Sequence, residues 1–169
     1  LAQAIEDVLS GASPAITPEQ MNAAISAVQQ QTQEKSMEKA KAAEQIGQDF
    51  RQAYRQQEGV SETDSGILYR VLTPGTGANP KVDDTVVVHY RGTLVDGTEF
   101  DSSIARGQPA TFSLGGIIAG WQESLQLMQE GARWEGVIPP ELGYGSTGAG
   151  GAIGPQETLI FEIELIEVK

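Results

Sequence analysis

The sequence predicts an α+β fold, in which an antiparallel, twisted β-sheet wraps around one short helix and an all-helical arm with one long helix precedes it. Two observations support this prediction. Residues 1–59 are rich in Ala, Gln, Glu and Lys, whereas residues 60–169 hold most of the 20 glycines and both tryptophans. Apolar residues recur at helical spacing in the first part and alternate in the second. We therefore expect a helical arm and connector over 1–59 and a separate β-rich domain over 60–169.

The long helix is expected to begin at Pro18. Thr17 supplies an N-cap side chain, Pro18 suits the first helical position, and Gln20 stands three residues after the cap. No further proline occurs before Gly59, which gives about 40 residues and a rod of roughly 60 Å. A shorter helix over residues 1–10 would precede it.

An apolar stripe follows one face of this long helix. It comprises Met21, Ile25, Val28 and Thr32, then more sparsely Met37, Ala40, Ile46, Phe50 and Tyr54. Such a rod is too long to bury its stripe against a domain of normal size, so we expect a homodimer through residues 1–32. For residues 33–57 a solvated connector held by charged pairs is favoured. A single solvated helix throughout is the alternative.

Turn residues divide the second part into short strands. An Asp96-Gly97 dipeptide predicts a hairpin turn, and Leu159 and Phe161 alternate with acidic residues, as in a sheet with one covered face. Trp121 and Leu125 stand at helical spacing within the one expected short helix. The expected strands are 66–72, 84–92, 132–138 and 158–168, and the expected helix is 119–128.

The composition excludes several classes of function. The 169 residues carry 11 Lys and Arg against 23 Asp and Glu, and this net charge of −12 argues against binding to nucleic acid or anionic membranes. The absence of cysteine excludes disulfides and thiolate chemistry, and a single histidine argues against a metal site or a conventional catalytic triad. No apolar run approaches the ~20 residues of a membrane span. We expect no metal and no cofactor.

Two motifs are set aside. Residues 143–148 match the spacing of a dinucleotide-binding fingerprint, which requires a helix at its end, but the following residues 149–151 cannot open one. A turned loop over a site fits better. His89 lies among valines in an expected strand, where a packed or surface residue is the common case.

The informative feature is an aromatic and aliphatic set with few titratable groups. Its members are Tyr90, Phe100, Phe112, Ile117, Ile118, Trp121, Tyr144, Ile153 and Phe161. One interpretation makes them ordinary core, and for Phe112 alone it is preferred. A pocket is favoured by Trp121 at a helix start and Tyr144 in a glycine loop, because their polar groups need a partner when buried.

Four motifs follow one another along residues 66–169. They are Val88-His89-Tyr90-Arg91-Gly92-Thr93-Leu94-x-Asp96-Gly97-x-x-Phe100-Asp101-Ser102-Ser103, Ile118-x-Gly120-Trp121, Ile138-Pro139-x-x-Leu142-x-Tyr144-Gly145, and Thr158-Leu159-Ile160-Phe161-Glu162-x-Glu164-Leu165. Together they resemble the FK506-binding protein (FKBP) type of peptidyl-prolyl cis-trans isomerase. The N-terminal part resembles the dimerisation arm of the bacterial macrophage infectivity potentiator (Mip) subgroup. Similar proteins start with a further helix, so Leu1 is expected to begin inside the arm.

The resemblance implies rotation about X–Pro peptide bonds, with proline-containing peptides and unfolded proteins as partners. Rotation breaks amide resonance against a barrier of ~18–20 kcal/mol, and no bond is attacked. A dry aromatic pocket favours the twisted amide, because water solvates the planar, charge-separated amide better. Such chemistry needs neither cysteine nor histidine.

The resemblance also implies roles for individual residues. Trp121 would form the floor under the proline ring, and Asp101 would face the twisting carbonyl, oriented by Arg106. For Asp101 the alternative is a structural role that ties its loop to Arg106. The Ile118 N–H and the Tyr144 hydroxyl would hold substrate carbonyls. The remaining walls and contacts would come from Tyr90, Phe100, Phe161, Ile117, Phe112 and Ile153.

Some positions depart from the family pattern, and they bear on substrate preference and inhibitor affinity. Ala110 stands where many members have Phe, residues 115–117 form a shorter stretch, and the loop tip at 149–152 lacks bulky groups. The resemblance implies that the macrolides tacrolimus and rapamycin occupy the same pocket. It also implies a bacterial location outside the cytoplasm, in the periplasm or at the outer-membrane surface. The rival hypothesis is a binding module, either a holdase chaperone or a host-surface ligand, whose proline pocket is secondary.

Overall fold

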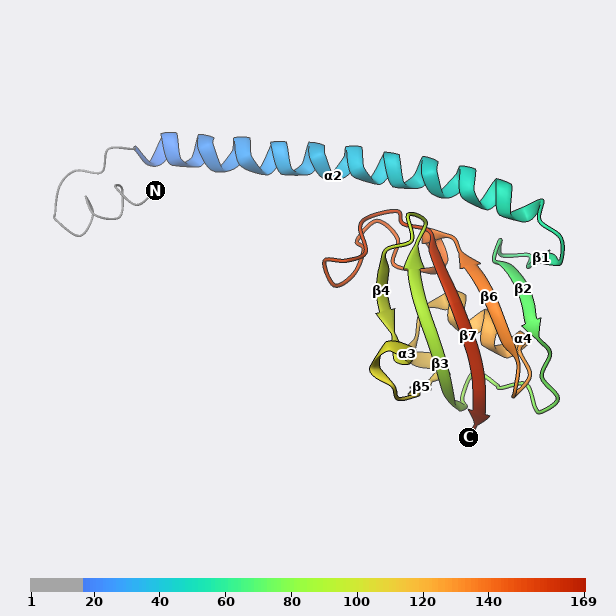
Figure 1. Cartoon of the computed structure of the whole chain (residues 1–169). Helices are drawn as coiled ribbons and strands as arrows, with labels where there is room; N and C mark the ends of the chain where they lie inside the picture. Colours follow the sequence, from blue (N-terminus) through green and yellow to red (C-terminus); the bar gives the residue numbers. More distant parts are fainter. Residues whose placement is uncertain (1–16) are drawn as a thin grey trace. The chain divides into compact units, whose positions relative to one another are not determined.

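The structure is a computed structural model that describes residues 17–169, and Figure 1 shows the path of the chain. The helix expected over residues 1–10 lies outside the described residues. Contacts divide the chain into two compact units between Glu38 and Lys39. The last part of the long helix therefore belongs to the unit that contains the sheet. The division at residues 59 and 60 stays a prediction.

Helix α2 runs over Pro18–Arg55, and it begins where the sequence predicts. The Gln20 N–H donates to Thr17 Oγ1 at 3.2 Å, and the Thr17 N–H donates to Gln20 Oε1 at 3.0 Å. These reciprocal bonds satisfy two donors that a helix start would otherwise leave unpaired. The expected capping residues are therefore confirmed.

The last turns of α2 contact the sheet. Tyr54 is only 4% exposed, and with partly buried Phe50 it packs against Leu68 and Val137. The expectation of a solvated connector over residues 33–57 is therefore wrong for these turns. Two aromatic side chains four residues apart lie on one helix face, and here that face covers a second surface of the sheet.

Seven strands form one antiparallel sheet in the order β1-β2-β6-β7-β3-β4, with β5 paired to β3. The four expected strands are confirmed as β2, β3, β6 and β7, with ends that differ by at most two residues. The hairpin turn is confirmed as well, since Gly97 has a φ of 86°. The bounds are β1 Val60–Glu62, β2 Leu68–Thr73, β3 Thr85–Leu94, β4 Glu99–Ser102, β5 Ala110–Ser113, β6 Arg133–Ile138 and β7 Leu159–Val168.

The expected short helix is confirmed as α4, Ala119–Leu127. The sequence did not predict α3, which forms a single turn over Ser103–Arg106. A four-residue helix has too few residues to show a period in the sequence. Two 3₁₀ turns, η1 (Leu114–Gly116) and η2 (Pro140–Leu142), complete the elements.

Alternate residues of the strands serve the two faces of the sheet. On β7, Phe161 and Ile163 join the large core cluster that contains Trp121 and Leu125 of α4, whereas Ile160 packs on the opposite face with Tyr54. Figure 1 shows α4 lying against the sheet. The large cluster is the core on which the pocket described below is built.

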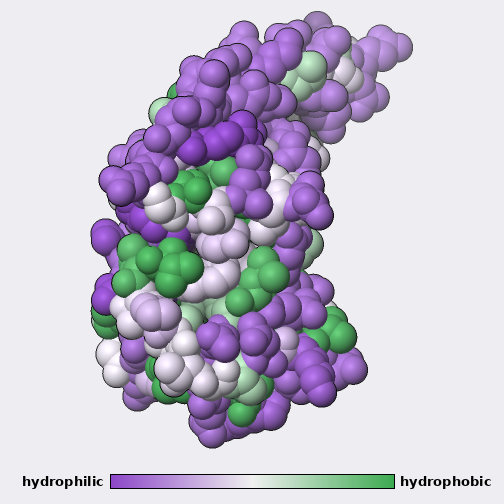
Figure 2. All heavy atoms as spheres, turned by 90° about the vertical axis from the view of Figure 1, so that its right-hand side faces the viewer, coloured by the Kyte–Doolittle hydropathy of each residue, from purple (hydrophilic) through white to green (hydrophobic). Residues whose placement is uncertain are grey.

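On the face of the molecule that Figure 2 shows, apolar side chains form separate islands in a mostly hydrophilic surface. Among the described residues no helix combines the length and the apolar character that crossing a membrane would require.

Candidate functional site

A cavity of about 520 Å³ opens beside α4. Its walls come from β3, β4, β5, β7, the start of α4 and the loop after η2. It is lined by Tyr90, Phe100, Asp101, Phe112, Gly116, Ile117, Ile118, Trp121, Tyr144, Ala149, Gly150, Ala152, Ile153 and Phe161. Of the site residues expected from the sequence, all but Arg106 line this cavity. The other four lining residues, Gly116, Ala149, Gly150 and Ala152, were not among the expected site residues, because small residues in turns and loops carry no side-chain signal.

Aromatic rings meet edge to face around Trp121. The Trp121 ring centroid lies 5.1 Å from those of Tyr90 and Phe161, at interplanar angles of 85° and 82°. Phe112 approaches it at 5.6 Å and 88°, while it also packs against the core. This arrangement places the positive edge of one ring against the negative face of the next. The rings hold one another rigidly and still leave one side of the cluster facing the cavity.

The Trp121 indole is almost fully buried, yet it lines the cavity rather than being sealed beneath it. Its Nε1–H has no hydrogen-bond partner within residues 17–169. A buried N–H without a partner costs free energy, which a bound acceptor would recover.

Two aromatic rings of the cavity wall approach the backbone of β3 so closely that only glycine fits at position 92. A Cβ at Gly92 would lie 2.6 Å from the Phe100 ring and 2.8 Å from the Phe161 ring. The two rings themselves meet at 5.4 Å and 86°. Gly92 therefore allows both aromatic walls to stand over β3.

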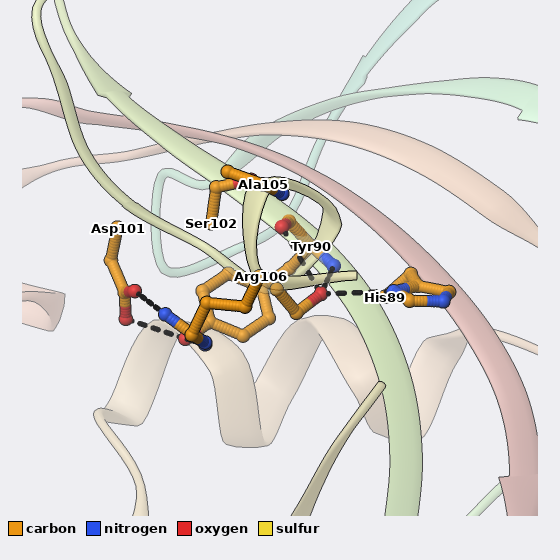
Figure 3. Close-up of polar contacts among 7 residues, drawn as sticks. His89, Tyr90, Asp101, Ser102, Ala105 and Arg106 are labelled. Carbon is orange, nitrogen blue, oxygen red and sulfur yellow. Dashed lines mark hydrogen bonds and ion pairs between the residues drawn. The ribbon is translucent and has the colours of Figure 1, made fainter. Parts of the chain in front are cut away.

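A polar network flanks the aromatic cluster (Figure 3). The Tyr90 hydroxyl donates to Asp101 Oδ2 at 2.5 Å, and Arg106 Nη1 forms an ion pair with Asp101 Oδ1. Arg106 Nη2 also donates to the Tyr90 hydroxyl at 2.9 Å, and its guanidinium lies 5.6 Å from the centroid of the Tyr90 ring. Arg106 thus does not line the cavity but contacts two residues that do.

These contacts set the ionisation of the network. Burial alone would raise the pKa of Asp101, but hydrogen bonds from Tyr90 and Arg106, together with the charge of Arg106, hold that pKa below its ordinary value. Burial, and then the bond to Asp101, raises the pKa of the Tyr90 hydroxyl. At neutral pH the cavity therefore carries a carboxylate beside a neutral phenol.

Helix α3 positions this network. Ser102 Oγ caps the helix by accepting from the Ala105 N–H at 3.1 Å, and Gly107 ends it with a φ of 71°. The buried Ser103 Oγ accepts from the Tyr90 N–H at 2.8 Å and lies 3.1 Å from His89 Nδ1. His89 is thus a packed strand residue that does not line the cavity, as expected.

The loop after η2 is turned back on itself. Gly148 N–H donates to the Tyr144 carbonyl at 3.1 Å, and Ala149 pairs with Ile153. Gly148 has a φ of 67°, and a Cβ there would overlap the Ile153 carbonyl oxygen. No helix follows, so setting aside a dinucleotide-binding fingerprint at residues 143–148 is confirmed.

The chemistry available in this cavity is limited and specific. The lining offers apolar rings, one paired carboxylate and the phenol of Tyr144, which is 39% exposed. Within residues 17–169, no three His, Asp or Glu side chains are grouped to hold a metal ion. Such a cavity suits non-covalent binding of an apolar ring and removal of water from a polar bond next to it.

Comparison with known protein families gives two matches. A family described as FKBP-type peptidyl-prolyl cis-trans isomerase matches residues 77–166, and one described as the domain amino terminal to that isomerase matches residues 1–71.

Two curated proteins are similar over the whole chain. The FKBP-type 22 kDa peptidyl-prolyl cis-trans isomerase of Escherichia coli is 42% identical over 99% of this chain and 82% of its own length. The outer membrane protein MIP of Legionella longbeachae is 46% identical over 100% of this chain and 74% of its own length. The chain spans about half the length of some other relatives, such as the isomerase Mip of Coxiella burnetii.

Solved structures support the same relationship. The crystal structure of FkpA from Escherichia coli superposes with a TM-score of 0.83 at 37% identity, over 99% of this chain and 80% of FkpA. A peptidyl-prolyl cis-trans isomerase from Pseudomonas syringae gives a TM-score of 0.72 at 44% identity, over 77% of this chain and 96% of its own. Both the catalytic fold and the preceding helix are therefore shared. The chain belongs to the FKBP-type peptidyl-prolyl cis-trans isomerases and acts on peptide bonds that precede proline.

Proposed function

We propose that the cavity binds the proline ring of a client over Trp121 and lowers the barrier to rotation by taking the X–Pro amide out of water. The observation that supports this most directly is the edge-to-face ring cluster, which leaves apolar surface facing a cavity of about 520 Å³. The planar amide is the more polar form, so its desolvation favours the twisted transition state.

Asp101 acts on the twisting carbonyl in this proposal. Its carboxylate lines the cavity, and Tyr90 and Arg106 fix both of its oxygens. A fixed charge acts on the transition state without the cost of reorienting itself during the reaction. The structural alternative is that the same contacts only tie α3 to β4.

The Tyr144 hydroxyl and the Ile118 N–H hold substrate carbonyls on either side of the proline. The Tyr144 hydroxyl belongs to a cavity-lining residue, and Ile118 stands at the N-cap of α4. The Tyr144 side chain is partly exposed before binding, so its hydroxyl exchanges a hydrogen bond to water for one to the substrate, and the net gain is modest.

A protease-coupled assay on a proline tetrapeptide tests these assignments. Asp101→Leu is expected to lower kcat/KM by about tenfold or more, which corresponds to about 1.4 kcal/mol of transition-state stabilisation. Tyr144→Phe is expected to lower it about threefold. Glu99→Leu is the matched control, because it also removes a carboxylate from β4. The Glu99 carboxylate pairs with Arg91, and Glu99 does not line the cavity. Unchanged isomerisation in both site variants would count against the assignment.

The same variants separate an isomerase from a binding module. If the main activity is a holdase, Asp101→Leu still suppresses aggregation of an unfolded protein while its isomerisation is lost. If isomerisation is the main activity, refolding of a client limited by proline isomerisation slows in proportion to the loss of kcat/KM. We propose that both activities are present and that proline isomerisation requires the pocket.

We also propose that α2 mediates a homodimer. Met21, Ile25 and Val28 lie at helical spacing and are each about half exposed, which is unfavourable for a stripe of apolar side chains in water. Light scattering at tens of micromolar is expected to give twice the chain mass, and Ile25→Glu with Val28→Glu is expected to give the monomer. A monomer at that concentration for the unchanged chain would contradict the dimer.

Two further proposals follow from the family. Tacrolimus and rapamycin bind this cavity, and we expect them to quench Trp121 fluorescence in a Trp134→Phe background. Ala110 packs against the large core cluster and stands where many family members have Phe, so we expect the affinity for both compounds to rise on Ala110→Phe. The protein acts outside the cytoplasm, in the periplasm or at the outer-membrane surface, which cell fractionation of the expressing bacterium tests.

A further inference from the structure

The pocket loop, residues 143–157, depends on contacts at its two ends. It carries five of the cavity-lining residues, which are Tyr144, Ala149, Gly150, Ala152 and Ile153. Its internal bonds are local, and the Gln156 N–H joins the loop ends by donating to the Gly145 carbonyl at 2.8 Å. A loop this rich in glycine gains much conformational entropy when released, so what holds its ends decides where its lining residues lie.

The second end of the pocket loop contacts α2. Thr158, the residue after the loop, is fully buried, and its Oγ1 accepts a hydrogen bond from Arg51 Nη1. Arg51 is itself partly buried. The helix therefore contacts the end of the loop through a side chain that does not line the cavity.

Gly47 makes this approach possible. It is the sole glycine of α2 and is buried, and a Cβ there would overlap Thr158 Oγ1 and lie 3.1 Å from Thr158 Cβ. Glycine disfavours a helix interior relative to alanine, so its presence one turn before Arg51 marks a required close contact. Two residues on one face of α2 thus meet the same buried threonine.

The pKa of Arg51 is also affected by a residue just before the first end of the pocket loop. Burial lowers the pKa of Arg51, whereas the negative charges of Glu141 and Glu44 raise it. Glu141 belongs to η2, whose Pro140 carbonyl accepts from the Gly145 N–H at 2.9 Å. A guanidinium stays charged at any physiological pH, so the charge of Glu141 attracts Arg51 without an ion pair, while the direct contact of Arg51 is with Thr158.

We propose that Arg51, together with Gly47, is a positioning residue for the isomerase reaction and holds the pocket loop over the cavity. This rests on the proposed function, in which Tyr144 and Ile153 contact the substrate. Without Arg51 the Thr158 hydroxyl loses its partner, and the loop ends separate from α2. The lining residues then spend less time in the position that binds a prolyl peptide, and apparent affinity falls by the fraction of closed loops.

The test compares Arg51→Ala with Arg55→Ala. Arg55 lies one turn later and pairs with Glu62 at the surface, so it controls for loss of a helix arginine. Arg51→Ala is expected to raise KM for a proline tetrapeptide about fivefold with kcat changed less than twofold, and Arg51→Lys is expected to recover part of the affinity. Arg55→Ala is expected to leave both constants unchanged.

Hydrogen exchange shows whether a rise in KM comes from release of the pocket loop. In Arg51→Ala the amides of residues 143–157 are expected to exchange at least fivefold faster, while those of β3 and β7 keep their rates. Thr158→Val removes only the hydroxyl from a buried site and is expected to reproduce both effects if Arg51→Ala proves unstable. An unchanged KM and exchange pattern in Arg51→Ala and Thr158→Val, or an equal effect of Arg55→Ala, would overturn the proposal.

The test of Arg51 can fail or succeed independently of the test of the proposed catalytic residues. If Tyr144→Phe and Asp101→Leu leave isomerisation unchanged while Arg51→Ala still accelerates exchange in the loop and raises KM, the site assignment fails and the positioning role stands. If exchange accelerates but KM does not rise, the loop is held by Arg51 without serving the reaction, and the positioning role fails.

Discussion

Strands β6 and β7 contribute side chains to both faces of the sheet, and the two faces differ: one packs against α2, and the other borders the cavity. Neighbouring residues Ile160 and Phe161 of β7 point to different faces, as do Val137 and Ile138 of β6. We call the face covered by the end of α2 the outer face. Its cluster is small and consists of Tyr54, Leu68 and Val137, with Phe50, Val60 and Ile160 packed against them. The pocket cluster is larger and leaves its aromatic rings facing a cavity.

The polar groups of the two faces differ in the same way. On the outer face the Tyr54 hydroxyl donates to Glu135 Oε1 at 2.6 Å, and Arg70 pairs with the same carboxylate at 2.7 Å. The Arg70 Nε–H on this face and the Trp121 Nε1–H on the pocket face are both buried without a partner within residues 17–169, but only Trp121 lines the cavity. The outer face thus pairs its carboxylate within the protein, whereas the unpaired donor of the pocket face belongs to a cavity-lining residue that a ligand can reach.

The largest expected effect comes from truncating one side chain on each face of β7. Phe161→Ala removes a ring that contacts Trp121 at 5.1 Å, and it is expected to cost about 3–5 kcal/mol of unfolding free energy and most of the isomerase activity. Ile160→Ala is expected to cost about 2 kcal/mol, near the low end for isoleucine because the residue is only partly buried. Urea denaturation and the tetrapeptide assay measure both quantities.

In that experiment Ile160→Ala is expected to keep its activity per folded molecule. An equal loss of activity in both variants would show that the outer face also shapes the pocket directly, and the division of labour between the faces would be wrong.

The pocket face could be predicted from the sequence because its residues are unusual for their places. Tryptophan at a helix start and tyrosine in a glycine-rich loop indicate a binding surface, and the ordered motifs around them resemble one family. The predicted set converges on one cavity because a single β-domain folds these strands around one helix. The four strands predicted from the sequence were those long enough to alternate, whereas β1, β4 and β5, of three or four residues, were not predicted.

The outer face could not be predicted in the same way. Phe50 and Tyr54 continue a sparse stripe along α2, and nothing local distinguishes a stripe that covers a sheet from one that faces water. The requirement for Gly47 appears only once Thr158, more than one hundred residues later, is placed beside it. Long-range pairing of this kind depends on the register of the whole sheet, which sequence periodicity does not specify.

A smaller effect on the unfolding free energy is expected from Tyr54→Phe, which removes one hydrogen bond on the outer face. The loss is about 1–2 kcal/mol at pH 7, because the hydroxyl donates to a charged acceptor that Arg70 still pairs with. Isomerase activity is expected to stay within twofold. Urea denaturation of the two proteins at pH 7 measures the difference.

The pH dependence of that difference identifies its cause. Burial, and then the bond to Glu135, raises the pKa of Tyr54 above its ordinary value of 10.0. A raised folded pKa gives stability that is full below the ordinary value and is lost as pH rises through the folded value. The stability advantage of the unchanged protein over the Tyr54→Phe variant is therefore expected to shrink above pH 10, and a constant difference up to pH 11 would show that the hydroxyl is not its source.

The smallest effect concerns a carboxylate at the end of the pocket loop, which contrasts with the paired Glu135. Burial, and then the charge of Asp96, raises the pKa of Glu157 above its ordinary value of 4.5, so the ionised group costs stability at pH 7. Glu157→Gln is expected to raise the unfolding free energy by about 0.5 kcal/mol or less, the usual range for sites outside the core. The gain disappears as pH falls below the ordinary value, because both side chains are then neutral. Thermal unfolding at pH 7 and pH 4 distinguishes this from a packing effect, which would persist at both, and a loss of stability at pH 7 would show that the carboxylate has a partner in the loop.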